Sequence, residues 1–431
     1  MAGAGRTDGL QAGVAEVEIT PPVGTPLCGD LQPRDSVGVQ DPLYAKAIVL
    51  QCGGRRLAYV ALDLIGLPLQ EGEEAVSLAS QRTGIPATDI VWAATHTHTG
   101  PYTGRGPGSV EGPVNREWLD GLPDKFAEAV GRAHASLRPA KMSRLRGFHH
   151  GLAHNRRVMF KDGRAINTWN LGNADERVQS VGLAGPTDPE IGMLTFDDEH
   201  GELLAVLFHF SLHTNTNFGD HFSADYPGVV AARLRERFGP RVSTLFLPGA
   251  FGDLNCWGRT YREVGDALAD AMIPLIEQRE GDPAELRLAA TKRRVWAVYR
   301  DFTEDQEERI RQSGWPPERQ EVFREGVEAL REAGKTGAET LLQAWRIGEV
   351  AFASLPGELF VEWGLKIKRE SPFPWTYPVE LGGDSLGYLV TPEAAAAGGY
   401  EPLSKVSADA VGHLVDEALE MLEELHSEEA S

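Results

Sequence analysis

Three pairs of apolar, β-branched runs, each joined by a short turn that contains glycine, constrain the fold of this chain most strongly. The turns lie at Gly53-Gly54, at Asp162-Gly163 and near His200-Gly201. Two such runs joined by a glycine turn are typical of a β-hairpin, whose strands pair antiparallel. Doubly wound parallel folds alternate strand and helix more strictly, so the sequence predicts sheets that contain antiparallel pairs.

Helical periodicity separates these hairpins. Apolar residues three and four positions apart predict helices at residues 116–137, 226–238, 261–277 and about 407–426. Hairpins with helices inserted between them predict an α/β fold of the mixed α+β kind, in which mixed β-sheets have helices packed outside.

The segment at about 301–337 is dense in Glu, Arg and Gln and has weak helical periodicity. It predicts a helical excursion from the body of the protein. A solvated helix pair is the simpler interpretation, and a lid over the substrate is the alternative. The chain has neither an internal repeat nor a linker long enough to separate independent domains, so we expect a single domain over residues 1–431.

Composition narrows the possible partners. The chain has 42 Lys plus Arg against 63 Asp plus Glu, and its formal net charge is -21. This charge repels nucleic acid and anionic membrane surfaces. The sequence shows no secretory leader and no apolar run of about 18 residues that could span a membrane. Its three well-separated cysteines suit a reducing compartment, so we expect a soluble, cytoplasmic protein that acts on a small molecule.

Two histidines end an apolar run in the segment DIVWAATHTHTGP. On an extended backbone, His96 and His98 project from the same face and can share a site. A buried imidazole needs hydrogen-bond partners, so packing alone gives no reason for two histidines at this position. The pair therefore indicates a functional site.

Two further apolar runs end in polar residues. One ends in His213 within HFSLHTNTN, and the other ends beside Asp253 and Asn255 within LPGAFGDLNCW. His209, four residues before His213, is expected to be a hydrogen-bonded core histidine. Histidines and carboxylates from separate strand ends are the composition of a catalytic zinc site, although spacing alone leaves open whether these segments meet. The H-E-x-x-H, G-x-S-x-G and Gly-rich phosphate-loop motifs are absent.

The order of the motifs THTHTGP, HNRR, LHTN, AFGDLN, LPGELF and GYLVTPEAAAAGGYE resembles the catalytic domain of the neutral ceramidases. The resemblance runs from VAEVEITPPVG to about residue 407. It implies the fold of that catalytic domain and a zinc-dependent hydrolase of an amide bond. The residues that remain leave no room for the immunoglobulin-like C-terminal domain of ceramidases, so we expect one ceramidase-like catalytic domain.

By the same resemblance, zinc is bound by His96, His213, Glu358 and Tyr388. His98 lies beside the metal and is the candidate to stabilise an oxyanion or to move protons.

Other motif residues are expected to face the substrate. These are Asn155 and Arg156 of the HNRR motif and Tyr400 of the GGYE motif. Asp253 is expected to orient a metal ligand.

One departure from the family pattern bears on the mechanism. Ceramidases carry GDVSPN, whose serine has been assigned a catalytic part, whereas this chain has Asn255 at that position. Asparagine cannot form an acyl intermediate, so attack by water that the metal activates is the simpler mechanism. Asn255 then becomes a candidate for substrate binding, and the side chain of Cys256 is expected to point elsewhere.

These inferences predict a zinc amidohydrolase that cleaves a small, soluble N-acyl or amide substrate. Ceramide itself would require a hydrophobic channel and access to membranes. Two alternatives stay open: an ester or lactone hydrolase with the same metal, and a metal-stabilised binding or biosynthetic accessory protein without turnover.

Overall fold

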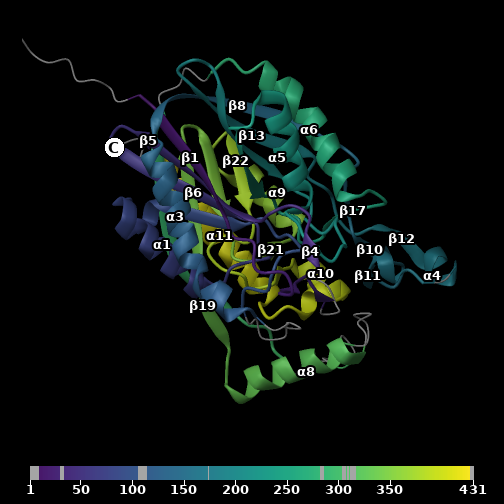
Figure 1. Cartoon of the computed structure of the whole chain (residues 1–431). Coiled ribbons are helices and arrows are strands. Elements are labelled where there is room, and N and C mark those ends of the chain that lie inside the picture. Colours follow the sequence, from purple (N-terminus) through teal and green to yellow (C-terminus); the bar gives the residue numbers. More distant parts are fainter. Residues whose placement is uncertain are drawn as a thin grey trace, which may run out of the picture.

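The computed structural model describes residues 9–29, 34–104, 114–172, 174–281, 286–302, 307, 310 and 317–427. The fold contains two main sheets flanked by helices (Figure 1). None of the described helices combines the length and the apolar character that crossing a lipid bilayer requires.

The larger sheet has eight strands in the order β16-β14-β13-β8-β1-β5-β6-β7. Neighbouring strands pair antiparallel except β6 with β7 and β14 with β16, which pair parallel. The strands are β1 (Gln11–Glu18), β5 (Tyr44–Cys52), β6 (Arg55–Leu62), β7 (Ile90–Ala94), β8 (Arg138–Phe148), β13 (Glu190–Asp198), β14 (Leu203–Phe210) and β16 (Ser243–Pro248). The hairpins β5–β6 and β13–β14 confirm two of the predicted turns, and β10–β11 in a smaller sheet confirms the third.

The second sheet has four strands, β18 (Leu288–Val298), β19 (Gly337–Ile347), β20 (Val350–Ser354) and β22 (Trp375–Val379). It packs against the inner face of the larger sheet, where Tyr59 of β6 stacks on Trp345 of β19 at 5.8 Å between ring centroids. The Tyr59 hydroxyl also donates to the Phe246 carbonyl of β16 at 2.8 Å. The larger sheet is therefore curved, and its two ends approach each other around a shared core.

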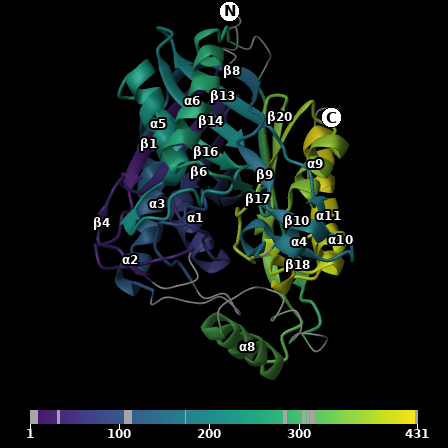
Figure 2. The same cartoon turned by 90° about the vertical axis from the view of Figure 1, so that its right-hand side faces the viewer.

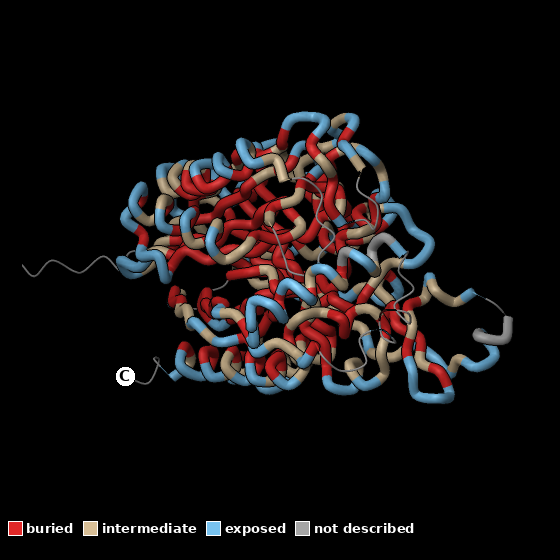
Figure 3. The backbone as a smooth tube through the Cα atoms, turned by 90° about the horizontal axis from the view of Figure 1, so that it is seen from below, coloured by how far each residue is buried: buried red, intermediate tan, exposed pale blue. Residues whose placement is uncertain are grey.

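Helices cover the outer faces, so the layers run helix, sheet, sheet, helix (Figure 2). Helices α1 (Leu69–Thr83) and α3 (Leu122–Ala135) pack on one half of the larger sheet, and α5 (Asp225–Phe238) and α6 (Tyr261–Glu277) on the other. Helices α9 (Val361–Glu370) and α11 (Ala408–Ser427) cover the four-stranded sheet. Buried residues concentrate between these layers and exposed ones on the outer helix faces (Figure 3). The predicted mixed α/β fold is confirmed.

The predicted helices at 226–238, 261–277 and 407–426 agree with α5, α6 and α11 within one residue at each end. The single helix expected at 116–137 is two helices, α2 (Arg116–Asp120) and α3, which meet at Gly121. Pro123 stands in the first turn of α3, where its missing N–H costs no helical hydrogen bond. A new helix therefore starts after Gly121 in place of a continuation.

The 301–337 segment contributes α8 (Pro317–Glu332), which lies apart from the layers (Figure 1). Residues 303–306, 308–309 and 311–316 of the predicted excursion lie outside the described part of the chain. The remaining short elements are β2 (Pro26–Leu27), β3 (Arg34–Asp35), β4 (Gly38–Val39), β9 (Ala153–Asn155), β10 (Arg157–Phe160), β11 (Ala165–Asn167), α4 (Ala174–Gln179), β12 (Ser180–Leu183), β15 (His221–Phe222), β17 (Leu254–Cys256), β21 (Glu358–Leu359), β23 (Tyr388–Leu389) and α10 (Pro392–Ala397), with three-residue 3₁₀ turns at 87–89, 168–170 and 401–403.

Candidate metal centre and its cavity

The loops after β7 and β14 meet directly. The His98 amide donates to the Thr214 carbonyl at 3.2 Å, and the Thr214 hydroxyl donates to the Thr95 carbonyl at 2.8 Å. The curvature of the larger sheet makes this possible, because β7 and β14 are distant in the strand order. These contacts bring His96 and His98, which follow β7, to the same place as His213, which follows β14.

The three imidazoles converge through their Nε2 atoms. His96 Nε2 lies 3.0 Å from His213 Nε2, and His98 Nε2 lies 3.3 Å and 3.2 Å from these two atoms. His96 and His213 are buried, and burial is the main reason why the pKa values of His98 and His213 are well below the ordinary value. Neutral imidazoles are the form that binds metals.

Each of the three Nδ1 atoms faces a backbone carbonyl. The acceptors are the carbonyls of Ile65 for His96 at 2.6 Å, Gly29 for His98 at 2.8 Å and Phe251 for His213 at 3.1 Å. A carbonyl only accepts, so each Nδ1 carries a proton, and in the neutral imidazole, the form that binds a metal, each Nε2 then has a free lone pair. Three lone pairs that face one point repel each other unless a cation lies between them. The hydrogen bond from the other ring nitrogen to a carbonyl is also what orients histidines that bind a metal.

Glu358 completes one side of the cluster. Its Oε2 lies 3.4 Å from His96 Nε2 and 3.7 Å from His213 Nε2. This oxygen is buried and has no hydrogen-bond donor among the described residues. The short parallel pair β21–β23 sets Glu358 opposite Tyr388, another predicted ligand. A buried carboxylate oxygen without a donor, beside three imidazole lone pairs, fits a divalent cation such as zinc.

His96 adopts a left-handed backbone with φ of 67°. Such a conformation is uncommon for a residue other than glycine and marks sites where the surroundings hold a strained backbone. The strand β7 ends at Ala94, so the alternation of side chains on an extended strand does not bring the two histidines together. The side chains of His96 and His98 do lie together, as the sequence predicted, but the left-handed backbone at His96 brings them together and strand alternation does not.

Arg156 and Tyr400 lie together beside the cluster. The buried Arg156 donates from Nη2 to the Tyr400 hydroxyl at 2.7 Å and from Nε to Glu401 at 3.0 Å. The Tyr400 hydroxyl lies 3.0 Å from that of Tyr388. Burial opposes the charge of Arg156, but Tyr400, Tyr388 and Glu401 raise its pKa well above the ordinary value. Burial also raises the pKa of Tyr400 to about 12, although Arg156 lowers it.

Glu401 was not among the residues predicted from the sequence. This fully buried carboxylate accepts hydrogen bonds from Arg156, from Arg157 at 2.7 Å and from Asn167 at 2.6 Å. Burial opposes its charge, but the two arginines keep its pKa below the ordinary value. The signal was present, because an acidic residue directly follows Tyr400 and could answer the paired arginines of HNRR.

Asn155 and Asp253 are structural partners in this geometry. Asn155 is fully buried, its Nδ2 donates to Asp253 Oδ2 at 2.6 Å, and its Oδ1 accepts from the Arg157 amide at 3.1 Å. Asp253 Oδ1 accepts from the Val361 amide at 2.9 Å, and its pKa is raised to about 7 by burial and by Glu362. Both amide atoms of Asn155 are engaged within the protein, so its predicted substrate contact gains no support.

Asn255 and Cys256 line a separate hollow of about 320 Å³. Asn255 Oδ1 accepts from Arg156 Nη1 at 3.3 Å, so this side chain reaches the site indirectly. Burial raises the pKa of the Cys256 thiol, which makes it a poor nucleophile. His209 is buried and donates from Nε2 to the Pro378 carbonyl at 2.8 Å, as predicted for a core histidine.

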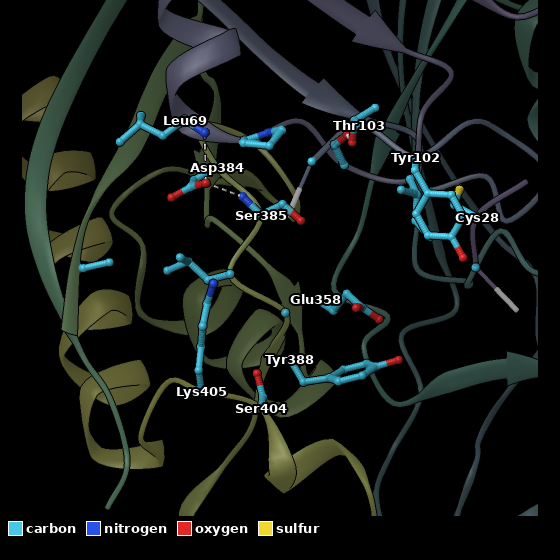
Figure 4. A pocket seen from close by; sticks show the side chains of 18 of the residues that line it. Cys28, Leu69, Tyr102, Thr103, Glu358, Asp384, Ser385, Tyr388, Ser404 and Lys405 are labelled. Carbon is cyan, nitrogen blue, oxygen red and sulfur yellow. Dashed lines mark hydrogen bonds between the residues drawn. The ribbon is translucent and has the colours of Figure 1, made fainter. Parts of the chain in front are cut away.

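The histidine cluster opens into a cavity of about 660 Å³. Figure 4 shows part of the cavity wall, with Glu358 and Tyr388 near its middle. Its wall includes His96, His98, Glu358, Tyr388 and Tyr400. A second part of the wall is apolar and comes partly from α8 and from the chain before it. Its residues are Phe302, Phe323, Val327, Leu330, Leu386 and Leu403. A volume of this size accommodates a molecule of several hundred daltons.

The fold and site define a mixed α/β protein with a candidate metal centre at the wall of a half-apolar cavity. Comparison with known proteins finds one of similar sequence. Over 210 residues the chain is 28% identical to the neutral ceramidase of Pseudomonas aeruginosa, a stretch that is 46% of this chain and 29% of that relative. No family model matches the chain.

Solved structures extend the similarity. The crystal structure of neutral ceramidase from Pseudomonas aeruginosa matches with a TM-score of 0.74 at 20% identity and covers 97% of this chain and 75% of that one. A structure described as ceramidase complexed with C2 also matches with a TM-score of 0.74, at 19% identity, over 98% of this chain and 76% of that one. The chain is therefore ceramidase-like, with the neutral ceramidase fold along nearly its whole length, as the motifs indicated.

Proposed function

We propose that this protein is a zinc-dependent hydrolase that cleaves an amide bond. The observation that carries the proposal is the convergence of three imidazole Nε2 atoms on one point, next to an oxygen of Glu358 that has no hydrogen-bond donor among the described residues. Partial sequence similarity to a neutral ceramidase supports the amide as the bond cleaved.

His96, His213 and Glu358 would hold the zinc, with Tyr388 across the β21–β23 pair as a further ligand. His98 presents its Nε2 at comparable distances to the other two histidines, so it can either bind the metal or accept a proton from a water molecule beside it. Zinc bound here would polarise a carbonyl oxygen and lower the pKa of a water molecule to about 7.

Tyr400 would stabilise the charge that develops on the amide oxygen. Its raised pKa keeps the hydroxyl protonated at neutral pH. Arg156 can only donate to that hydroxyl, so the tyrosine proton points elsewhere, towards Tyr388 or a substrate oxygen. A hydrogen-bond donor held in place in this way is worth more than one that must reorient. Arg156 itself positions Tyr400, and Glu401 positions Arg156.

The cavity favours an amide with an apolar substituent, which narrows the small, soluble N-acyl or amide substrate that the sequence predicted. Six apolar side chains form the wall on the side of α8. Burying methylene groups there contributes about 0.8 kcal/mol each, which a small polar substrate would forgo. We also propose that the described elements form one catalytic domain that works in a reducing compartment, with which the three free thiols are consistent.

Metal analysis and hydrolysis test the proposal together. The purified chain should contain about one zinc per molecule and should release dodecanoate from N-dodecanoyl ethanolamine. His213→Ala should lose both zinc and activity, whereas His200→Ala, at an exposed position, should keep both. Zinc retained by His96→Ala and His213→Ala alike would refute the site, and faster cleavage of the matched ester alone would redirect the proposal to an esterase.

A further inference from the structure

A lysine lies in the wall of the same cavity. Lys405 follows the turn at 401–403, and its carbonyl accepts from the Arg300 amide at 2.9 Å. Its Nζ lies 5.9 Å from the centroid of the Tyr299 ring, within the range of a cation–π contact. Figure 4 shows Lys405 and Asp384 on one side of the cavity and Cys28 on the other, with Glu358 and Tyr388 between them.

Asp384 is the carboxylate whose charge acts on this ammonium group, but the two do not pair. Asp384 Oδ1 accepts from the Leu69 amide at 3.0 Å and the Ser385 amide at 2.7 Å, and its Oδ2 accepts from the Thr340 hydroxyl at 2.9 Å. Within the described ranges, no carboxylate oxygen lies within 4.0 Å of Lys405 Nζ. The carboxylate of Asp384 is thus already hydrogen-bonded by its own neighbours.

An ammonium group in a cavity wall without a close anion is costly. Burial lowers the pKa of Lys405, and the distant Asp384 offsets this only in part. A charged group that has lost its water is normally paired with an opposite charge, because the protein interior makes up for few of the contacts that the group had with water. The backbone of Lys405 is fixed by the Arg300 amide, and its side chain lines the cavity beside the Tyr299 ring, where a ligand in the cavity would meet it.

Resting on the proposed function, we infer that Lys405 binds an anionic group of the substrate, a carboxylate or a phosphate, while the scissile amide lies at the histidine cluster. The substrate class is then an N-acyl compound with an acidic head, such as an N-acyl amino acid. The net charge of -21 makes a dedicated cation necessary for such a substrate, because the whole molecule repels anions.

Arg116 offers a matched control. It also lines the cavity, but it is exposed at the start of α2, where solvent and salt screen its charge. Replacing it should affect an anionic substrate much less than replacing Lys405. The comparison separates a specific contact from a general effect of removing one positive charge.

Three probes with the same acyl chain test the inference in the zinc-loaded full chain: N-dodecanoylglycine, N-dodecanoylglycinamide and N-dodecanoyl phosphoethanolamine. The wild type should have a kcat/KM at least about tenfold higher for one of the anionic probes than for the neutral amide. Lys405→Met should remove that preference and leave the neutral amide nearly unchanged, which also shows that the variant is folded. Lys405→Arg and Arg116→Met should keep it.

The two anionic probes distinguish carboxylate from phosphate, and a preference for either one supports the inference. A wild type without anion preference, or a preference that survives in Lys405→Met, would overturn it. If Lys405→Met does not fold, Lys405→Gln serves in its place. Calorimetric binding of the same probes gives a readout without hydrolysis: selective binding lost in Lys405→Met but no cleavage would fail the proposed function alone, whereas cleavage without selectivity would fail this inference alone.

Discussion

Gly29 shows how closely the backbone is fitted to single residues of the site. Its carbonyl accepts from His98, its φ is 84°, and a Cβ at this position would lie 2.5 Å from the His98 ring. We predict that Gly29→Ala displaces His98 and weakens zinc binding by about tenfold to a hundredfold, the usual effect of losing a contact that orients a ligand. Titration against a zinc chelator measures the change.

Gly54→Ala separates displacement of His98 from backbone strain. Gly54 has a similar φ of 78°, and a Cβ there meets nothing within 4 Å. This variant should lose stability as Gly29→Ala does but keep its zinc affinity. Equal zinc affinities for the two variants would mean that the fit against His98 is unimportant.

At this scale the sequence predicted residue types better than their contacts. The histidines His96, His98 and His213 could be selected because apolar runs end in them. Their acceptors are backbone carbonyls, such as those of Ile65 and Phe251, and a residue of any type could supply such a carbonyl. Only the tertiary fold brings such carbonyls to a histidine, so no motif reports them.

Among the elements, β21 and the loop after β16 are joined by one buried carboxyl. Glu380 Oε2 accepts from the amides of Phe251 and Leu359, both at 3.0 Å. Phe251 carries the carbonyl that His213 faces, and Leu359 directly follows Glu358. Burial raises the pKa of Glu380 well above its ordinary value, and the two amide donors oppose this only in part.

Glu380→Ala should lower the free energy of unfolding by about 2–4 kcal/mol, because two buried N–H donors lose their acceptor. Glu380→Gln keeps an acceptor of the same shape and should cost less than about 1 kcal/mol. Urea denaturation of both variants measures the difference. If Gln proves as harmful as Ala, an amide oxygen cannot replace the carboxyl oxygen of Glu380 as the acceptor.

Helix α8 is expected to bind the apolar part of the substrate. Its buried residues Phe323, Val327 and Leu330 are four and three positions apart, so they share one face, and all three line the cavity. Val327→Asp should raise KM for a dodecanoyl amide about tenfold or more and leave the acetyl amide nearly unchanged. Ala329→Asp puts the same charge on the exposed face and should leave both substrates unaffected.

The excursion could be located from its composition, but its role could not. Glutamate and arginine dominate the segment, so a solvated helix pair was the simpler interpretation. Three apolar residues at helical spacing are too few to predict a lid from the sequence. Only the structure shows that these residues of α8 line the cavity. Steady-state kinetics on the two substrates will decide whether that contact matters.

For the whole molecule, hairpins and amphipathic helices predicted the layers but not the curvature. Local patterns report which residues pair across a turn. The approach of β16 to β6, through Tyr59 and Phe246, joins segments far apart in the sequence and depends on the summed twist of eight strands. The meeting of His98 with Thr214 follows from that curvature, so the site could be expected only from the resemblance.

Stability of the whole molecule should fall in acid, and His209 gives that dependence a measurable part. Burial, and next the charge of Lys368, lower its pKa from 6.5 to about 4. The unfolded chain binds the proton more readily, so stability is complete above about pH 6.5 and is lost as the pH falls towards 4. The shift corresponds to about 3 kcal/mol, since one pKa unit is about 1.4 kcal/mol.

His209→Gln can still donate to the Pro378 carbonyl but does not titrate. Urea denaturation in chelator at about pH 7 and pH 5 should therefore show a smaller loss of stability for this variant than for the wild type, by about 2 kcal/mol. His413→Gln, at an exposed position, should follow the wild type. Parallel pH profiles for His209→Gln and the wild type would show that His209 is protonated as readily in the folded protein as in the unfolded chain, contrary to its burial between the two sheets.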